Sequence, residues 1–191
     1  MAGQVTTELL DALLSPAASA GQHSPRAQAE RHLSSLSLPD RAGGLLHLLI
    51  ALSSSSSGDG QNQPRALLSA VLLRRDITVL GGNAHSATGL DNGTAMNMLR
   101  EMVGPLLQLF LSDSNGGSGK ATRRQVGHCL AELCLSCSVL GAENDGGAAV
   151  AAEVMAQVLT GIGPGVSFAR CALHVCCVVC DGIWPWVQEW E

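Results

Sequence analysis

The stretch AMNMLREMVGPLLQLFLSDSNGGSGKATRRQVGHCLAELCLSCSVL, residues 95–140, decides the fold. Up to Leu111 its apolar residues recur at helical spacing, and residues 112–119 are rich in Gly and Ser. From Lys120 to Leu140 apolar residues again return every three or four positions. Such spacing places apolar side chains on one face of an α-helix, and a Gly/Ser segment between two such faces predicts a turn. The stretch therefore predicts two helices joined into a hairpin.

The apolar sides of these two helices are expected to face inward. Thr94 is expected to cap the first helix, over 95–111. Pro105 lies inside that helix and is expected to kink it or split it at Gly104, because proline has no N–H for the helical ladder. The expected inward side chains are Met98, Leu99, Met102, Val103, Leu106, Leu107 and Phe110, then Val126, Cys129, Leu130, Leu133, Cys134 and Cys137.

Two similar pairs of helices precede this hairpin. The nearer pair is separated by residues 53–63, a tract of Ser, Gly, Asp, Asn and Gln that is expected to be a low-complexity loop. The farther pair contains Ser24-Pro25, a combination typical of a helix N-cap and first turn. The expected helices cover 5–14, 25–36, 41–52 and 64–80. In the last of them we expect Leu67, Leu68, Val71 and Leu72 to be buried, with Ile77 as a further candidate.

The pairs at 5–36, 41–80 and 95–140 repeat one order: helix, link, helix. A single hairpin cannot bury both of its apolar faces, whereas a row of hairpins buries them against one another. Without inserted loops each pair approaches the length of a HEAT or armadillo repeat, about 40–47 residues. We therefore predict an all-α fold, an α-α superhelix of HEAT/armadillo-like helical hairpins over residues 1–140. Residues 141–191 are expected to form an atypical C-terminal segment that could hold part of a further repeat.

Composition agrees with this fold and excludes some functions. Hydrophobic residues make up 46% of the 191 residues and aromatics only 3%, so the core must be built from aliphatic residues, Met and Cys. Leu and Ala favour helices, and Tyr and Phe, which favour strands, are nearly missing. The net charge is −5 and no run of basic residues occurs, which argues against nucleic-acid binding. No apolar stretch reaches the roughly 20 residues of a membrane span, so no membrane insertion is expected. The odd number of cysteines, 7, and the lack of a signal-peptide pattern favour reduced thiols in a reducing compartment.

Two motifs resemble ligand sites, but each departs from the pattern that such a site requires. Gly116 to Lys120 resembles a phosphate-binding loop, but Ser114 stands where the first glycine is needed and Ala121 where a hydroxyl is needed. The pairs Cys134/Cys137 and Cys177/Cys180 have the spacing of zinc ligands, but the first pair falls on the apolar face of an expected helix. We therefore predict no catalytic residue, cofactor site or metal site, and no enzyme.

Four stretches in this order resemble the N-terminal HEAT repeats of the importin-beta (karyopherin-beta) family. The first is LLDALLSP at 9–16, and the second is RAQAERHL at 26–33. The third, AVLLRRDI at 70–77, is the most distinctive, and the fourth is RQVGHCLAEL at 124–133. The resemblance implies a nuclear transport receptor-like protein, present in cytoplasm and nucleus, that binds the small GTPase Ran in its GTP form and protein cargo.

The resemblance also singles out Arg74 and Arg75 as partner-binding residues. They close the second helix of a repeat, and in the family such helices line the concave face that grips Ran. An alternative is that both arginines are solvated or cap helix carbonyls. We expect the chain to be a truncated or fragmentary member of the family. The alternative function is a generic HEAT/armadillo scaffold for protein–protein interaction, and a small thiol- or zinc-dependent protein is a distant third.

Overall fold

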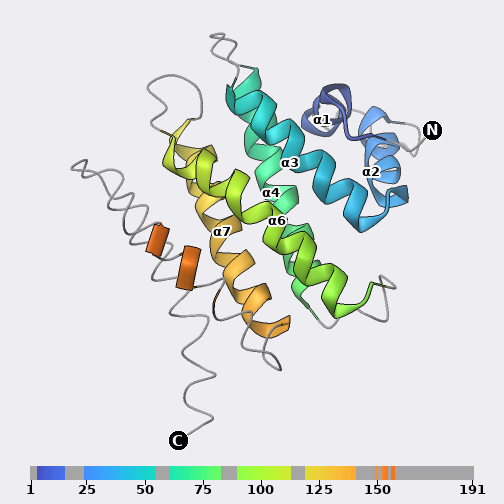
Figure 1. Ribbon diagram of the computed structural model, residues 1–191. Coiled ribbons are helices and arrows are strands. Elements are labelled where there is room, and N and C mark those ends of the chain that lie inside the picture. The colour runs from blue at the N-terminus through green and yellow to red at the C-terminus, as the bar shows by residue number, and fades with distance from the viewer. Residues whose placement is uncertain are drawn as a thin grey trace, which may run out of the picture. The chain divides into compact units, whose positions relative to one another are not determined.

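The computed structural model describes residues 4–15, 24–54, 61–82, 90–112 and 119–140, together with residues 149, 152–154 and 156–157. Throughout this part of the chain the regular structure is α-helix, and no strand occurs in it (Figure 1). The predicted all-α fold of helical hairpins is therefore confirmed.

Among the described residues up to Leu140, each of the three predicted pairs of helices is present, in the predicted order. The predicted loop at 53–63 is wrong at both ends, because the helix before it extends to Ser54 and the helix after it begins at Asn62, and residues 55–60 lie outside the described part. The predicted Cys/Val-rich segment at 171–180 lies outside the described residues. The helices are α1 (Thr7–Leu14), α2 (Pro25–Ser35), α3 (Leu38–Ser54), α4 (Asn62–Gly81), α6 (Asn92–Leu111) and α7 (Lys120–Leu140).

Local hydrogen bonds explain where the helices begin. The Ser24 hydroxyl accepts from the N–H of Ala27 at 3.2 Å, with Pro25 in the first turn of α2, as predicted. The prediction that α3 begins at Arg41 is wrong, because it begins at Leu38. The Ser37 hydroxyl accepts from the N–H of Asp40 and donates to its carboxylate. This reciprocal cap starts the helix one turn earlier than the apolar spacing indicated.

The start and middle of α6 also differ from the prediction. Asp91, not Thr94, is the N-cap: its carboxylate accepts from the Thr94 N–H at 2.9 Å and from the Thr94 hydroxyl at 2.6 Å. These hydrogen bonds from Thr94 lower the pKa of Asp91. The helix continues through Gly104 and Pro105, so the predicted split does not occur.

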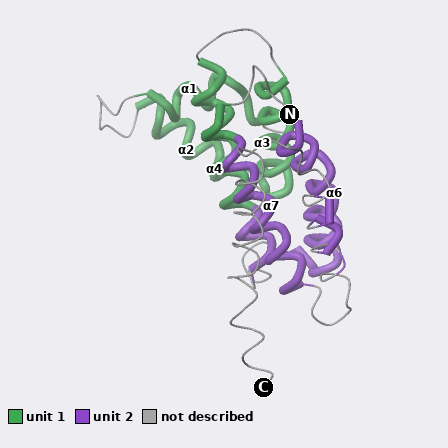
Figure 2. The backbone as a smooth tube through the Cα atoms, turned by 90° about the vertical axis from the view of Figure 1, so that its left-hand side faces the viewer, with its two compact units in different colours: residues 1–76, 114–122 green, residues 77–113, 123–191 purple. Residues whose placement is uncertain are grey.

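The chain divides into two compact units (Figure 2). Unit 1 comprises Met1–Asp76 and Ser114–Thr122, and unit 2 comprises Ile77–Asp113 and Arg123–Glu191. In unit 1, Arg41 near the start of α3 pairs with Asp76 towards the end of α4, so the two helices run antiparallel. In unit 2, Arg123 at the start of α7 donates to the carbonyl of Ser112, just after α6, at 2.7 Å. Each of these hairpins is therefore antiparallel.

The core of unit 2 lies mainly between α6 and α7. All of the side chains predicted to face inward from α7 are buried. In α6 the prediction is mostly correct, but Met98 and Val103 are half-buried, and Met96 is buried instead. The buried set includes Leu99, Met102, Leu106, Leu107, Phe110, Val126, Cys129, Leu130, Leu133, Cys134 and Cys137.

In unit 2 the end of α4 contacts α7 without space for a side chain. A Cβ atom on Gly81 would overlap the side chain of Ser136, whose hydroxyl donates to the carbonyl oxygen of Ile77 at 3.4 Å. The ends of these two second helices of neighbouring hairpins therefore lie side by side. That is the packing expected of stacked hairpins.

Replacing Gly81 with alanine is expected to lower the free energy of unfolding by about 1–3 kcal/mol, because the added methyl group overpacks this contact. The measurement is urea denaturation followed by circular dichroism. Gly43→Ala in α3 is the matched control, since a Cβ there meets nothing within 4 Å. Removing that glycine from a helix interior is expected to stabilise the protein by about 0.5–1 kcal/mol. Equal effects of the two substitutions would contradict the close contact.

Candidate protein-binding surface

The outward side of α4 is apolar, contrary to the prediction from the sequence. Leu68, Val71, Leu72 and Arg75 follow one another at spacings that share one helix face. Val71 is 42% exposed, Arg75 is exposed, and the two leucines are half-buried. We call these four residues the α4 strip. Leu67, at its edge, is also half-buried.

The predicted burial of Leu67, Leu68, Val71 and Leu72 is therefore wrong, and that of Ile77 is confirmed. The physical reason is that α4 carries apolar residues on both sides. Periodicity cannot choose between two such faces, and the side that carries Asp76 is the one that turns inward. The buried side comprises Ala66, Ser69, Ala70, Leu73, Asp76, Ile77 and Leu80.

A buried ion pair fixes which side of α4 faces out. The Arg41 guanidinium donates from Nε and Nη2 to the two carboxylate oxygens of Asp76, at 2.8 and 2.6 Å. Its third nitrogen donates to the carbonyl of Leu33 at the end of α2, at 3.2 Å. The Asp76 side chain is only 3% exposed, and its hydrogen bonds raise the pKa of Arg41. Rotating α4 to bury the strip would pull Asp76 away from Arg41 and break this ion pair, leaving the half-buried guanidinium without its carboxylate.

A second ion pair holds the beginning of α4. Arg65 donates to both carboxylate oxygens of Asp11 in α1, each at 2.6 Å. The Asp11 side chain is 48% exposed, so solvent screens this pair more than the one at Asp76. The two pairs lie on α4 to either side of Val71 and join it to α1 and α3. The α4 strip therefore lies on a helix that ion pairs hold near both ends, and these pairs oppose rotation of α4 about its own axis.

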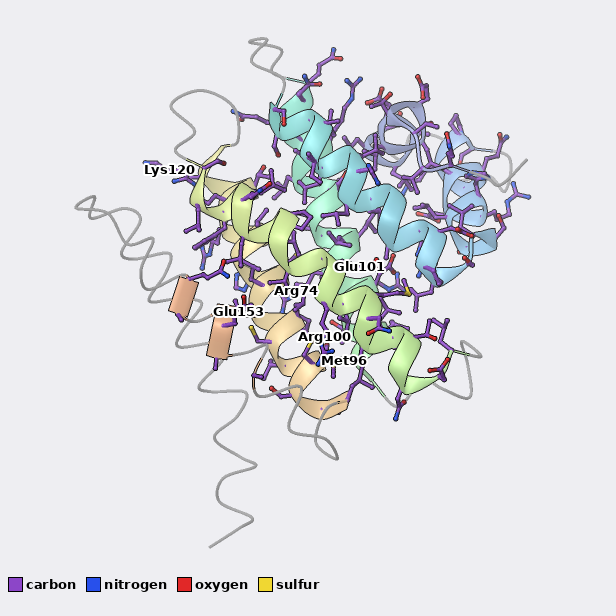
Figure 3. The ribbon with its side chains drawn as sticks, in the orientation of Figure 1. Arg74, Met96, Arg100, Glu101, Lys120 and Glu153 are labelled. Atoms are coloured by element: carbon purple, nitrogen blue, oxygen red, sulfur yellow. The ribbon has the colours of Figure 1, made fainter. Side chains whose placement is uncertain are left out.

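The charges of α4 are all positive where it faces solvent. Its sole carboxylate, Asp76, is buried against Arg41. The two predicted partner-binding residues differ in accessibility: Arg75 is exposed at the end of the strip, whereas Arg74, labelled on α4 in Figure 3, is half-buried. Their role as partner contacts stays a prediction, and Arg75 is better placed for it.

A shallow hollow lies elsewhere in unit 1, on the outward side of α3. It has a volume of about 600 Å³ and is lined by Gln4, Val5 and the α3 face from Asp40 to Ala51. Gly44 allows this arrangement, because a Cβ there would lie 2.9 Å from the Cγ2 of Val5. The Asp40 carboxylate in its wall already bonds to Ser37. The other polar side chains of the hollow are Gln4 and His47, and both are exposed, as Asp40 is, so the hollow has no buried polar side chain in its lining.

The thiols of α7 are buried, as predicted. Cys129, Cys134 and Cys137 are inaccessible and unpaired by disulfides. Burial raises the pKa of Cys134 to about 12 and that of Cys137 to about 11. Such thiols are poor nucleophiles at neutral pH. Among the described residues no group of three or more His, Cys, Asp or Glu is placed to hold a metal, and Cys177 and Cys180 lie outside them.

These raised pKa values predict a loss of stability in alkali. The folded state keeps both thiols protonated, so stability is full below about pH 9 and falls as pH rises towards about 12. The chain has no Tyr and Lys120 is its only lysine, so thiols are the main side chains with ordinary pKa values in this range, and the variant that removes two of the seven cysteines isolates their share. Urea midpoints measured from pH 8 to pH 11 should fall, and the double variant Cys134→Ala/Cys137→Ala should show a flatter decline. An equal decline in both proteins would contradict the assignment.

Within the part of the chain that the structure describes, no helix combines the length and the apolar character needed to cross a bilayer. No family model, no curated protein and no solved structure matches the chain. The resemblance to importin-beta proteins therefore stays a prediction from the sequence.

Proposed function

We propose that this chain acts by binding other proteins and performs no chemistry of its own. The observation that carries the proposal is the α4 strip: an apolar helix face, held outward by a buried ion pair and ending in an exposed arginine. A helix can bury either of two apolar faces, so leaving one at the surface forgoes burial free energy. Exposed apolar surface of this kind is typical of protein interaction sites.

The residue types of the strip suit a protein partner. Apolar residues supply contact area, and arginine is enriched at interfaces because its planar fork pairs with carboxylates while its stem packs on apolar surface. Arrays of helical hairpins present such residues along successive helices, which suits a folded partner with a large surface.

The proposed partners are the GTP form of Ran and protein cargo, as the importin-beta resemblance implies. Two features support this choice. The predicted hairpins are present in the predicted order, and Arg74 and Arg75 do lie on the second helix of a hairpin. The protein would then work in cytoplasm and nucleus as a nuclear transport receptor-like binder.

A pull-down of purified Ran tests this function. The chain is immobilised and incubated with Ran loaded with GTP or with GDP, and the bound Ran is quantified. We expect retention of the GTP form at least about tenfold above the GDP form, a difference of about 1.4 kcal/mol. Retention of neither form would reject the transport function and favour the generic helical-repeat scaffold. Equal retention of both forms would also count against it.

A further inference from the structure

We propose that the α4 strip receives an amphipathic helix that carries Asp or Glu beside its apolar face. This inference rests on the proposed function, that the chain binds proteins, and it specifies the chemistry of the partner segment at this surface. Three features support it: the shape of the strip, its charge, and the charge conflict that two strips packed face to face would create.

The strip has the shape of one side of a helix–helix contact. Leu68, Val71, Leu72 and Arg75 lie within a span of eight residues, about 10 Å along the axis or two turns. Val71 stands out at 42% exposure between the two half-buried leucines, which forms a ridge with apolar sides. Such a ridge fits between the side chains of an opposing helix. A partner helix would supply apolar residues at the same i, i+3, i+4 spacing.

The charge of the strip selects an acidic partner. Arg75 is exposed at one end, and Arg74 follows the edge of the same helix half-buried. The single carboxylate of α4 is taken by Arg41 inside unit 1, so it cannot neutralise the outward arginine. A carboxylate from a partner can reach Arg75 and form a forked pair, whereas a lysine or arginine there would be repelled.

The same charges argue against a second copy of the strip as the occupant. Two α4 helices packed face to face would present no carboxylate to either Arg75, because the outward side of the helix carries none. In a parallel pair the two arginines would meet directly, and in an antiparallel pair each would face apolar side chains. Both arrangements leave charge unpaired at the contact, which is costly.

Fluorescence anisotropy with designed peptides tests the inference on the full chain. The probe is a labelled helical peptide of about 18 residues, with leucines on one face and Glu on the flanks. The control peptide replaces every Glu with Lys and keeps the leucines. We expect the acidic peptide to bind at least about tenfold more tightly than the basic one. Similar affinities, or no binding of the acidic peptide, would overturn the inference.

Matched variants locate the site. Val71→Asp and Arg75→Glu should each weaken binding of the acidic peptide by about tenfold or more. The controls on α7 are Val139→Asp, at a valine with the same 42% exposure, and Arg124→Glu, at an exposed arginine. They should leave the affinity within about twofold. Equal weakening by the controls would place binding elsewhere. Ran retained without any effect of the α4 variants would sustain the proposed function and reject this inference alone.

Discussion

Replacing Asp76 with alanine is expected to lower the free energy of unfolding by about 2–4 kcal/mol, because it leaves the half-buried Arg41 charge without its partner. Asp76 accepts two hydrogen bonds from that guanidinium, at 2.6 and 2.8 Å, and is 3% exposed. The loss also frees the arginine that ties α2, through the Leu33 carbonyl, to α3. Urea denaturation of the purified protein measures the effect.

Two controls separate the buried pair from a general charge effect. Arg26→Ala removes an exposed pair with Glu30, at 3.0 Å within α2, and should cost less than about 1 kcal/mol. The double variant Arg41→Met/Asp76→Leu replaces both charges with apolar side chains and should recover much of the stability lost in Asp76→Ala. If Asp76→Ala cost no more than Arg26→Ala, the ion pair would not be what fixes α4.

Replacing Phe110 with alanine is expected to destabilise the protein by about 3–5 kcal/mol, because it opens a cavity in the core of unit 2. Phe110 is the largest of the side chains that are fully buried, and it comes from the last turn of α6. The urea midpoint should fall while the slope of the transition stays constant, since the same surface is exposed on unfolding.

The neighbouring substitution Leu109→Ala is the control for Phe110. Leu109 is only half-buried on the same helix turn, so its loss should cost clearly less. Alanine is the new residue in both variants, so the introduced residue has the same helix propensity in each. Comparable losses in the two variants would show that unit 2 is not packed around Phe110.

Much of the fold could be predicted from one residue pattern. In α7 every side chain that the apolar spacing predicts to face inward is buried, and Thr122, Ala131 and Ser136 are buried beside them. The starts of α3 and α6 could not be placed as well, because they depend on single side chains. Ser37 and Asp91 cap those helices from positions that apolar periodicity does not mark.

The candidate surface could be predicted only in part. The family resemblance predicts Arg75 as a partner contact, and its side chain is exposed, as such a contact requires. The apolar spacing predicts that Leu68 and Val71 are buried, because leucine and valine in a helix usually are. Asp76 is the residue that shows which face of α4 turns inward. Its carboxylate lies on the opposite side of the helix from the strip and pairs with Arg41. That pairing joins residues far apart in sequence, and helix spacing alone does not reveal it.

Taken together, the proposed function and the proposed docking surface predict that GTP-loaded Ran binds through the apolar outward face of α4. Calorimetric titration of GTP-loaded Ran into the wild-type chain, Val71→Asp and Val139→Asp tests it most directly. We predict that the wild-type chain and Val139→Asp bind alike and that Val71→Asp binds at least about tenfold more weakly. Absence of binding to the wild-type chain, or the same affinity in all three proteins, would contradict the claim.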